Sequence, residues 1–321
     1  MTGEGVTTGP RVEPLLALVG PTGVGKTALA LRLAREWAME VVSVDSRQVY
    51  RRMDIGTGKP TPEERAAVPH HLLDVVEPDA RYDAARFARD AAEAIRGIRA
   101  RGRLPVLVGG TGLYLRAFLR GLAPVPGRDP AFRAALAERA RREGPASLHA
   151  ELAAIDPERA ARIHPHDLVR ISRALEIHRA SGEPPSRLLA WRRTVPGEGV
   201  LVLGLTVPRS RLYARLEARV EAMLARGLLE EVRGLLRAGF SPELPALQGI
   251  GYRHMAAVLA GRLPLGEAIR AMKRDTRRYA KRQWAWFARE PGVLWVEVEP
   301  DDPEGAVKAV RAQVEAAGIF P

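Results

Sequence analysis

The chain has no cysteine among its 321 residues, which excludes disulfides and thiolate chemistry. It has no apolar run near the roughly 20 residues that span a bilayer, so we expect no membrane partner. Residues 1–13 lack the basic-then-apolar pattern of a signal peptide and are predicted to form a disordered tail. These absences favour a cytoplasmic location, and we expect a monomer.

Lysine is scarce, yet the net charge is +12 because arginine supplies almost all of the cations. A guanidinium matches a phosphate with two hydrogen bonds, so this composition favours a polyanionic partner such as a nucleic acid. A GC-rich genome or a high growth temperature would produce the same bias. The position of the charge along the chain has to decide between these interpretations.

The stretch "LLALVGPTGVGKTALA" predicts a phosphate site. It contains G-x-x-x-x-G-K-[ST], with Gly20, Gly25, Lys26 and Thr27 at the fixed positions. A buried strand pattern precedes it and a helical pattern follows, so the anion would meet backbone N–H groups at a helix N-terminus. Lys26 adds a charge and Thr27 offers a hydroxyl to Mg²⁺. The loop recognises phosphate oxygens and does not by itself imply a nucleoside triphosphate.

Alternating strand and helix patterns predict an α/β fold, a P-loop-type parallel sheet flanked by helices. We assign the catalytic core to residues 14–123 and 199–321, ending in basic helices. "VVSV" brings Asp45 to the end of one strand and "VLVGG" brings Thr111 to another. Sites of parallel sheets form at the carboxyl ends of the strands, so both should converge with the loop. Residues 124–198 show no strand pattern and are predicted to be an all-helical insertion.

The helical pattern at 264–289 concentrates positive charge. Seven cations lie between residues 270 and 282 against the single acid Asp275, with Tyr279, Trp284 and Trp286 interleaved. Phosphate-tracking cations beside stacking aromatics are typical of a nucleic-acid surface. The alternative is a basic surface helix whose tryptophans pack into the core. A second basic run, from Arg162 to Arg173, lies in the insertion.

Several polar groups have two interpretations each. Asp45 is either a Mg²⁺ ligand or a general base, and Thr111 either contacts a phosphate or leaving oxygen or caps the following helix. Arg211, Arg215 and Arg219 share one helix face; one would neutralise a leaving diphosphate while the others pair with nearby glutamates. The adjacent histidines at 70–71 point opposite ways with no third ligand nearby, which argues against zinc.

Taken together, the chain resembles the tRNA dimethylallyltransferase family, also called tRNA isopentenyltransferases. The segments that carry the resemblance occur in family order over residues 15 to about 290: "GPTGVGKT", "DSRQVYRRMDIGTGKP", "PHHLLDVVEP", "VLVGGTGLYLRA", "RISRALEI", "RLYARLEARVEAML", "IGYRH" and "RRYAKRQWAWF". The phosphate loop alone is common to many families. The long second segment followed by "GGTGLY" is far more specific.

The resemblance implies transfer of a dimethylallyl group from dimethylallyl diphosphate to the exocyclic amine of the adenine on the 3′ side of the anticodon. The substrates would be tRNAs that read codons beginning with U, and the products isopentenyladenosine and diphosphate. Asp45 matches the family's base, while Thr111 and Arg219 match positions that stabilise the leaving group, with Mg²⁺ on Thr27. The residues matching the family's diphosphate-binding loop are Gly20, Pro21, Thr22, Gly23, Val24, Gly25, Lys26 and Thr27.

The implied macromolecular partner is the tRNA anticodon stem-loop. The target adenine has to leave its stack to react, at modest cost in a single-stranded loop. The positions assigned to tRNA binding are Ser46, Arg47, Gln48, Arg133, Val169, Arg170, Ile171, Ser172, Arg173, Arg277, Lys281 and Arg282. The chain departs from the family at Ala285 and Ala288, where Thr and Arg are usual, which weakens any role for those two positions.

Two other classes of function compete with this one. A P-loop small-molecule kinase or NTPase explains the loop, with Asp45 on Mg²⁺, but not the basic helix that contains tryptophan. A non-enzymatic RNA-binding protein explains the charge but not an intact Gly-Lys-Thr.

Overall fold

The computed structural model describes residues 14–123, 125–189, 199–299 and 301–318. The predicted tail at 1–13 lies outside these residues. The chain divides into two compact units. One comprises the described residues up to Gly121 and from 199 onward, and the other comprises those between 122 and 189.

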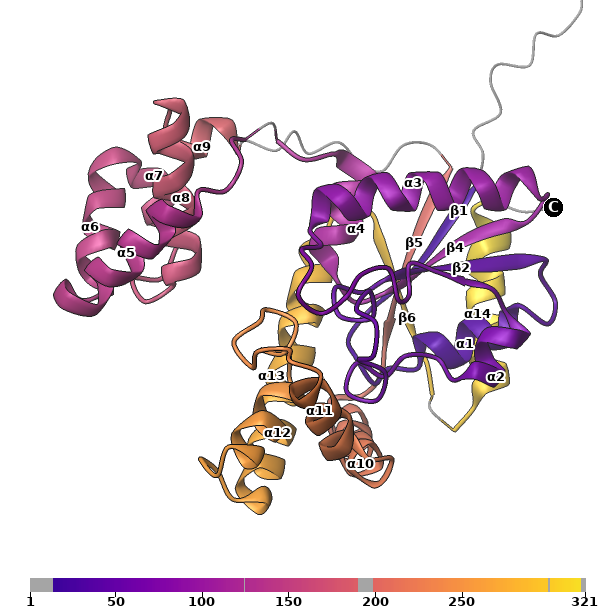
Figure 1. The fold of residues 1–321 in the computed structure, drawn as a ribbon. Coiled ribbons are helices and arrows are strands. Elements are labelled where there is room, and N and C mark those ends of the chain that lie inside the picture. Colours follow the sequence, from indigo (N-terminus) through magenta and orange to yellow (C-terminus); the bar gives the residue numbers. More distant parts are fainter. Residues whose placement is uncertain (1–13, 124, 190–198, 300, 319–321) are drawn as a thin grey trace, which may run out of the picture. The chain divides into compact units, whose positions relative to one another are not determined.

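The larger unit is built on a parallel sheet, and the α/β prediction is confirmed (Figure 1). Within the described residues the strand order is β3-β2-β4-β1-β5-β6. The strands are β1 Leu15–Val19, β2 Met39–Val44, β3 His70–His71, β4 Leu104–Gly109, β5 Val200–Thr206 and β6 Val293–Glu297. The central strands are buried on both faces, as expected for a sheet with a helical layer on each side.

Alternate residues of the strands enter two separate cores. Ala17, Val42 and Leu107 face the core that includes helix α3 Ala84–Ala100 and helix α4 Gly112–Arg120. Their neighbours face the second core, which includes α1 Lys26–Leu33 and α14 Pro303–Ala316, on the opposite side of the sheet in Figure 1. The short helix α2 Pro62–Ala67 precedes β3.

Four helices after β5 pack on one another and complete the larger unit. Helix α10 packs on α11 and α13, and α12 packs on α11 and α13 (Figure 1). Their bounds are α10 Arg209–Ala225, α11 Leu228–Arg237, α12 Tyr252–Leu259 and α13 Leu265–Phe287. Gly227, with φ 93°, separates α10 from α11.

The smaller unit is all helical within its described residues, as predicted. Its helices are α5 Pro130–Glu143, α6 Pro145–Ile155, α7 Pro157–Ala160, α8 Leu168–Ser181 and α9 Pro185–Leu188. Three of these helices start directly after an aspartate that caps them. The side chains of Asp129, Asp156 and Asp167 each accept a hydrogen bond from a backbone N–H of the helix that follows. Leu136, Leu148, Leu152 and Ile171 form its core.

The sheet register places three strand ends level with one another. Gly109 at the end of β4 pairs with Val19 of β1 and with Val44 of β2. The loops that begin at Gly20, Asp45 and Gly110 therefore leave the sheet side by side. A Cβ on Gly109 would lie 2.1 Å from the Val44 carbonyl oxygen, so only glycine allows this approach.

We expect Gly109→Ala to lower the free energy of unfolding by about 3 kcal/mol, because the clash is with backbone that cannot rotate away. Chemical denaturation measures the effect. Gly234→Ala is the matched control: this exposed glycine of α11 has open space around its Cβ, so alanine should stabilise the protein by about 0.5–1 kcal/mol. Equal unfolding midpoints for Gly109→Ala and the parent protein would contradict the argument.

Candidate functional site

A cavity of about 610 Å³ opens at the carboxyl ends of the strands, entirely within the larger unit. Its walls come from the loops after β1, β2 and β4, from residues 56–61, and from helices α10 and α13. Asp45, Lys26 and Arg219 all line it. The expected convergence of the phosphate loop with Asp45 therefore occurs in the structure.

The phosphate loop ends on the N-terminus of α1. Gly25 is the N-cap of α1 and has no side chain to satisfy the first N–H groups of the helix, which face an anion readily. Lys26 Nζ donates to the carbonyl oxygens of Gly20 and Pro21, at 2.9 and 2.8 Å.

Three members of the predicted diphosphate set shape the loop in this structure. Pro21 has no N–H to offer, and its carbonyl accepts from Lys26. The Val24 side chain is buried in the core. The Thr22 N–H donates a hydrogen bond to Gln283 Oε1 at 2.8 Å.

Lys26, Asp45 and Arg219 line the same cavity and form no ion pair with one another. Burial lowers the pKa of Lys26 to about 8, against the attraction of Asp45. Burial raises the pKa of Asp45, although backbone N–H groups and Lys26 partly offset this. Burial likewise lowers the pKa of Arg219. Among the described residues, no carboxylate forms an ion pair with Lys26 or Arg219. Two half-buried cations without a carboxylate partner fit an anionic ligand.

The carboxylate of Asp45 is held in one orientation by the chain that follows it. Its Oδ1 accepts the N–H groups of Arg47 at 2.8 Å and of Gln48 at 3.3 Å. Thr111 lies beside it, because its hydroxyl oxygen accepts the Ser46 N–H at 3.0 Å. Thr111 makes no side-chain cap for α4, so the capping interpretation is wrong.

Ser46, Arg47 and Gln48 line the cavity, but two of their side chains are engaged with the protein. Arg47 Nη1 donates to the Pro245 carbonyl at 2.5 Å. The Gln48 amide accepts from Ser43 and donates to the Gly58 carbonyl at 3.2 Å. In this structure Gln48 thus holds the 56–61 loop, and its assignment to tRNA binding stays a prediction.

The three arginines of α10 have three different environments. Arg211 pairs with Glu299 and Asp301, away from the site. Arg215 Nε donates to the Gly23 carbonyl at 3.0 Å and so holds the phosphate loop. The Arg219 guanidinium lies against Gly58, where a Cβ would be 1.7 Å from Nη2. Neither Arg215 nor Arg219 forms an ion pair with the glutamates that the helical spacing suggested as partners.

Some of the cations of helix α13 form ion pairs with glutamates, so the helix presents fewer unpaired cations than its sequence indicates. Arg277 pairs with Glu217 at 2.5 Å and Lys273 with Glu221 at 2.6 Å, both on α10. Arg277 is therefore held by a carboxylate in this structure, and its assignment to tRNA binding stays a prediction. The exposed cations in its second half are Arg278, Lys281 and Arg282.

Two roles were considered for the aromatic residues of α13, packing into the protein and exposure on its surface, and both occur. Trp286 packs over Gly112, with the Arg116 guanidinium 4.4 Å from its ring. Trp284 is 48% exposed, with its ring centroid 6.1 Å from that of Trp295. Tyr279 lines the cavity beneath Arg282, whose guanidinium is 5.7 Å from its ring.

In the smaller unit, the predicted tRNA set is only partly available. Arg133 binds the carboxylate of Glu176 with two hydrogen bonds, at 2.9 and 2.7 Å, and Arg173 binds it at 2.5 Å. Burial alone would raise the pKa of Glu176, but the two arginines hold it at about 2. Ile171 is fully buried, so its side chain is a core residue and not a ligand contact. Arg170 and Val169, which is 77% exposed, face solvent.

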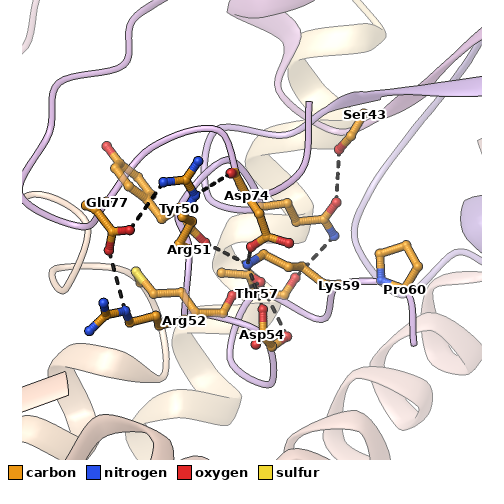
Figure 2. A network of polar contacts seen from close by, with 12 residues as sticks. Ser43, Tyr50, Arg51, Arg52, Asp54, Thr57, Lys59, Pro60, Asp74 and Glu77 are labelled. Carbon is orange, nitrogen blue, oxygen red and sulfur yellow. Dashed lines mark hydrogen bonds and ion pairs between the residues drawn. The ribbon is translucent and has the colours of Figure 1, made fainter. Parts of the chain in front are cut away.

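The loop that carries Gly58 is anchored by two charged side chains that sequence reasoning missed, the buried Lys59 and the half-buried Glu231. Lys59, whose side chain is 1% exposed, donates to the Tyr50 carbonyl, to Asp54 at 2.7 Å and to Asp74 at 2.5 Å (Figure 2). From α11, Glu231 accepts the N–H groups of residues 54–56, at 2.7 to 3.1 Å. The Glu231 contacts join segments at least 175 residues apart, so no local pattern marks them, whereas the Lys59 contacts span 5 to 15 residues.

The donor set around Thr27 fits Mg²⁺. The Thr27 side chain lines the cavity next to Lys26. Within the described residues there is no group of three or more His, Cys, Asp or Glu that could hold a metal. Mg²⁺ commonly takes few protein ligands and completes its shell with water and substrate phosphates. The two histidines of β3 make other contacts: His71 binds Glu40, and His70 binds the Val68 carbonyl.

Comparison with known proteins gives consistent matches over most of the chain. A family model described as "IPP transferase" matches residues 48–290, and one described as "Isopentenyl transferase" matches residues 14–74. A tRNA dimethylallyltransferase of Geobacter sulfurreducens is 51% identical over 284 residues, 88% of this chain and 91% of that protein. One of Anaeromyxobacter sp. (strain K) is 54% identical over 299 residues, 92% and 96% of the two chains.

Solved structures agree with these matches. The full-length tRNA isopentenylpyrophosphate transferase of Bacillus halodurans is 39% identical, with a TM-score of 0.69 over 96% of this chain and 98% of that chain. A eukaryotic dimethylallyltransferase described as acting on tRNA is 28% identical, with a TM-score of 0.76 over 97% and 81%. None of the helices described is long and apolar enough to cross a membrane.

We expect Lys59→Met to lower the free energy of unfolding by about 3 kcal/mol, because two carboxylates lose a buried cation. Lys308→Met, on the exposed face of α14, makes the same chemical change and should alter stability by less than about 0.5 kcal/mol. Denaturant titration of the two variants compares them. Similar losses in both would mean that the Lys59 network contributes nothing specific.

Proposed function

This chain belongs to the tRNA dimethylallyltransferase family, and on that premise we propose that it prenylates the adenine on the 3′ side of a tRNA anticodon. Dimethylallyl diphosphate is the proposed donor, and the exocyclic amine of the adenine is the acceptor. The observation that carries the proposal is one cavity lined by a phosphate-loop motif, two cations without a carboxylate partner and a half-buried carboxylate. A diphosphate supplies the missing negative charge.

The donor's diphosphate would bind where α1 begins. The first N–H groups of α1 and the charges of Lys26 and Arg219 are fixed before the reaction, so little reorganisation is needed as the leaving group gains charge. Thr27 is the residue that would hold Mg²⁺, whose contribution is to offset negative charge on the diphosphate.

Asp45 is the proposed general base. The amine of adenine is a weak nucleophile because its lone pair is delocalised into the ring. As its nitrogen bonds to C1 of the dimethylallyl group, the bond from C1 to the diphosphate oxygen breaks and diphosphate leaves with that electron pair. One proton of the amine passes to the Asp45 carboxylate, which its backbone hydrogen bonds keep oriented. The raised pKa of Asp45 makes it a better proton acceptor than an exposed aspartate.

The RNA would contact exposed cations of both units. On α13 these are Arg278, Lys281 and Arg282, the last of which also lines the cavity. In the smaller unit they include Arg170, beside Val169. A catalytic role for the larger unit, tRNA contact by the insertion, a monomeric state and a cytoplasmic location stay predictions.

The first test is transfer itself, with Asp45→Asn as the diagnostic variant. Purified protein with Mg²⁺ and dimethylallyl diphosphate should prenylate an unmodified tRNA that has adenines at and after the third anticodon position. Asp45→Asn should bind the tRNA normally and lose about 10²- to 10⁴-fold in rate, because the amine keeps its proton. Asp79→Asn, at an exposed position, is the control and should leave the rate unchanged.

A parallel reaction with ATP separates the alternative. ATP hydrolysis or phosphoryl transfer without prenyl transfer would favour a P-loop kinase or NTPase. Unchanged turnover in Asp45→Asn would remove Asp45 as the base.

The pH dependence of kcat/KM for the donor should be bell-shaped. Asp45 accepts a proton only when ionised, so the rate should rise with pH through a pKa above that of an ordinary aspartate. Lys26 carries its charge only below its pKa, so donor capture should fall as the pH rises through about 8. In Lys26→Arg the upper limb should vanish, because the guanidinium stays charged. An upper limb near pH 8 that persists in Lys26→Arg would exclude Lys26 as its cause.

A further inference from the structure

Gln283 joins the two loops that bracket the cavity. It lies on α13, is 6% exposed, and uses both ends of its amide. Its Oε1 accepts the Thr22 N–H of the phosphate loop at 2.8 Å, and its Nε2 donates to the Gly110 carbonyl at 3.0 Å. Thr111, whose hydroxyl lies beside Asp45, is the next residue after Gly110. One side chain thus bridges the donor cradle and the Thr111 loop, which the sheet register places side by side.

The surrounding residues are shaped to this amide. A Cβ on Gly110 would lie 2.2 Å from Gln283 Nε2, so only glycine at that position leaves room for it. An apolar residue in place of Gln283 would leave a buried N–H and a buried carbonyl without partners. Both loops would then lose a fixed contact at the point where the diphosphate binds.

The other face of the same helix is exposed and cationic. Arg278, Lys281 and Arg282 lie within five residues of Gln283 on α13 and face solvent. RNA phosphates that bind these cations would restrain the helix and, with it, the buried amide. When one ligand orders an element that two ligands share, less conformational entropy is lost when the second ligand binds.

We propose that Gln283 is a positioning residue through which RNA bound to α13 strengthens binding of the diphosphate group. The proposal rests on the function proposed above. The coupling is reciprocal, so diphosphate in the cradle strengthens RNA binding by the same factor. A purely structural role for Gln283 would instead weaken diphosphate binding equally with and without RNA.

Calorimetry of the full chain measures the coupling directly, with inorganic diphosphate and Mg²⁺ as the probe. The dissociation constant is determined alone and in the presence of saturating anticodon stem-loop RNA. In the parent protein the ratio of the two constants should be about fivefold or more. In Gln283→Met, which keeps the length of the side chain but makes neither hydrogen bond, the ratio should fall to about one while RNA alone still binds.

Two further variants complete the design. Gln283→Asn keeps an amide that is one methylene too short to span the loops, and it should also lose the ratio. Gln313→Met, exposed on α14, repeats the chemical change at a position remote in sequence from both loops and should retain the parent ratio. If Gln283→Met does not fold, the test relies on Gln283→Asn and on hydrogen exchange of the parent protein. In the exchange experiment, RNA should slow exchange of the Thr22 amide.

The outcomes distinguish this inference from the proposed function. A parent protein that transfers the prenyl group but shows a ratio near one overturns the coupling alone. So does a ratio that survives in Gln283→Met, or Thr22 exchange that RNA leaves unchanged. A parent protein that neither binds diphosphate nor transfers the prenyl group overturns the proposed function as well.

Discussion

Two half-buried cations and one half-buried carboxylate that do not form ion pairs with each other are the constraint on which the site depends. Even partial removal of a charge from water is unfavourable unless a partner compensates, and Lys26 and Arg219 have only dipoles and a nearby Asp45. Such an arrangement persists only if the surrounding structure holds the groups apart. The rest of the larger unit can be understood as the means of doing so.

The side chains that hold the three groups come from distant parts of the chain. Arg215 binds the phosphate loop from α10, Gln283 binds it from α13, and Glu231 and Lys59 fix the loop against which Arg219 lies. The C-terminal helices are therefore part of the cavity's framework as well as the surface proposed for RNA. This explains why the site needs both the sheet and the helices that follow β5.

The same structure changes how the positive charge of the chain is understood. Arg133 and Arg173 neutralise the buried Glu176, and Arg277 and Lys273 bind glutamates of α10. These arginines and this lysine stabilise packing, so they add little to an RNA-binding surface. The cations that remain exposed on α13 are fewer, and one of them, Arg282, also lines the cavity.

The sequence by itself determined the α/β class, the phosphate loop, the helical character of the insertion and the placement of Asp45 and Thr111 at strand ends. Each of these is encoded locally, by periodicity of two or 3.6 residues or by a fixed motif spacing. Only the tertiary structure decided which cations are paired, which predicted contacts such as Ile171 are core, and that Gln283 bridges two loops. The physical reason is separation along the chain: Thr22 and Gln283 are 261 residues apart, and their hydrogen bond exists only after the sheet and α13 have packed together.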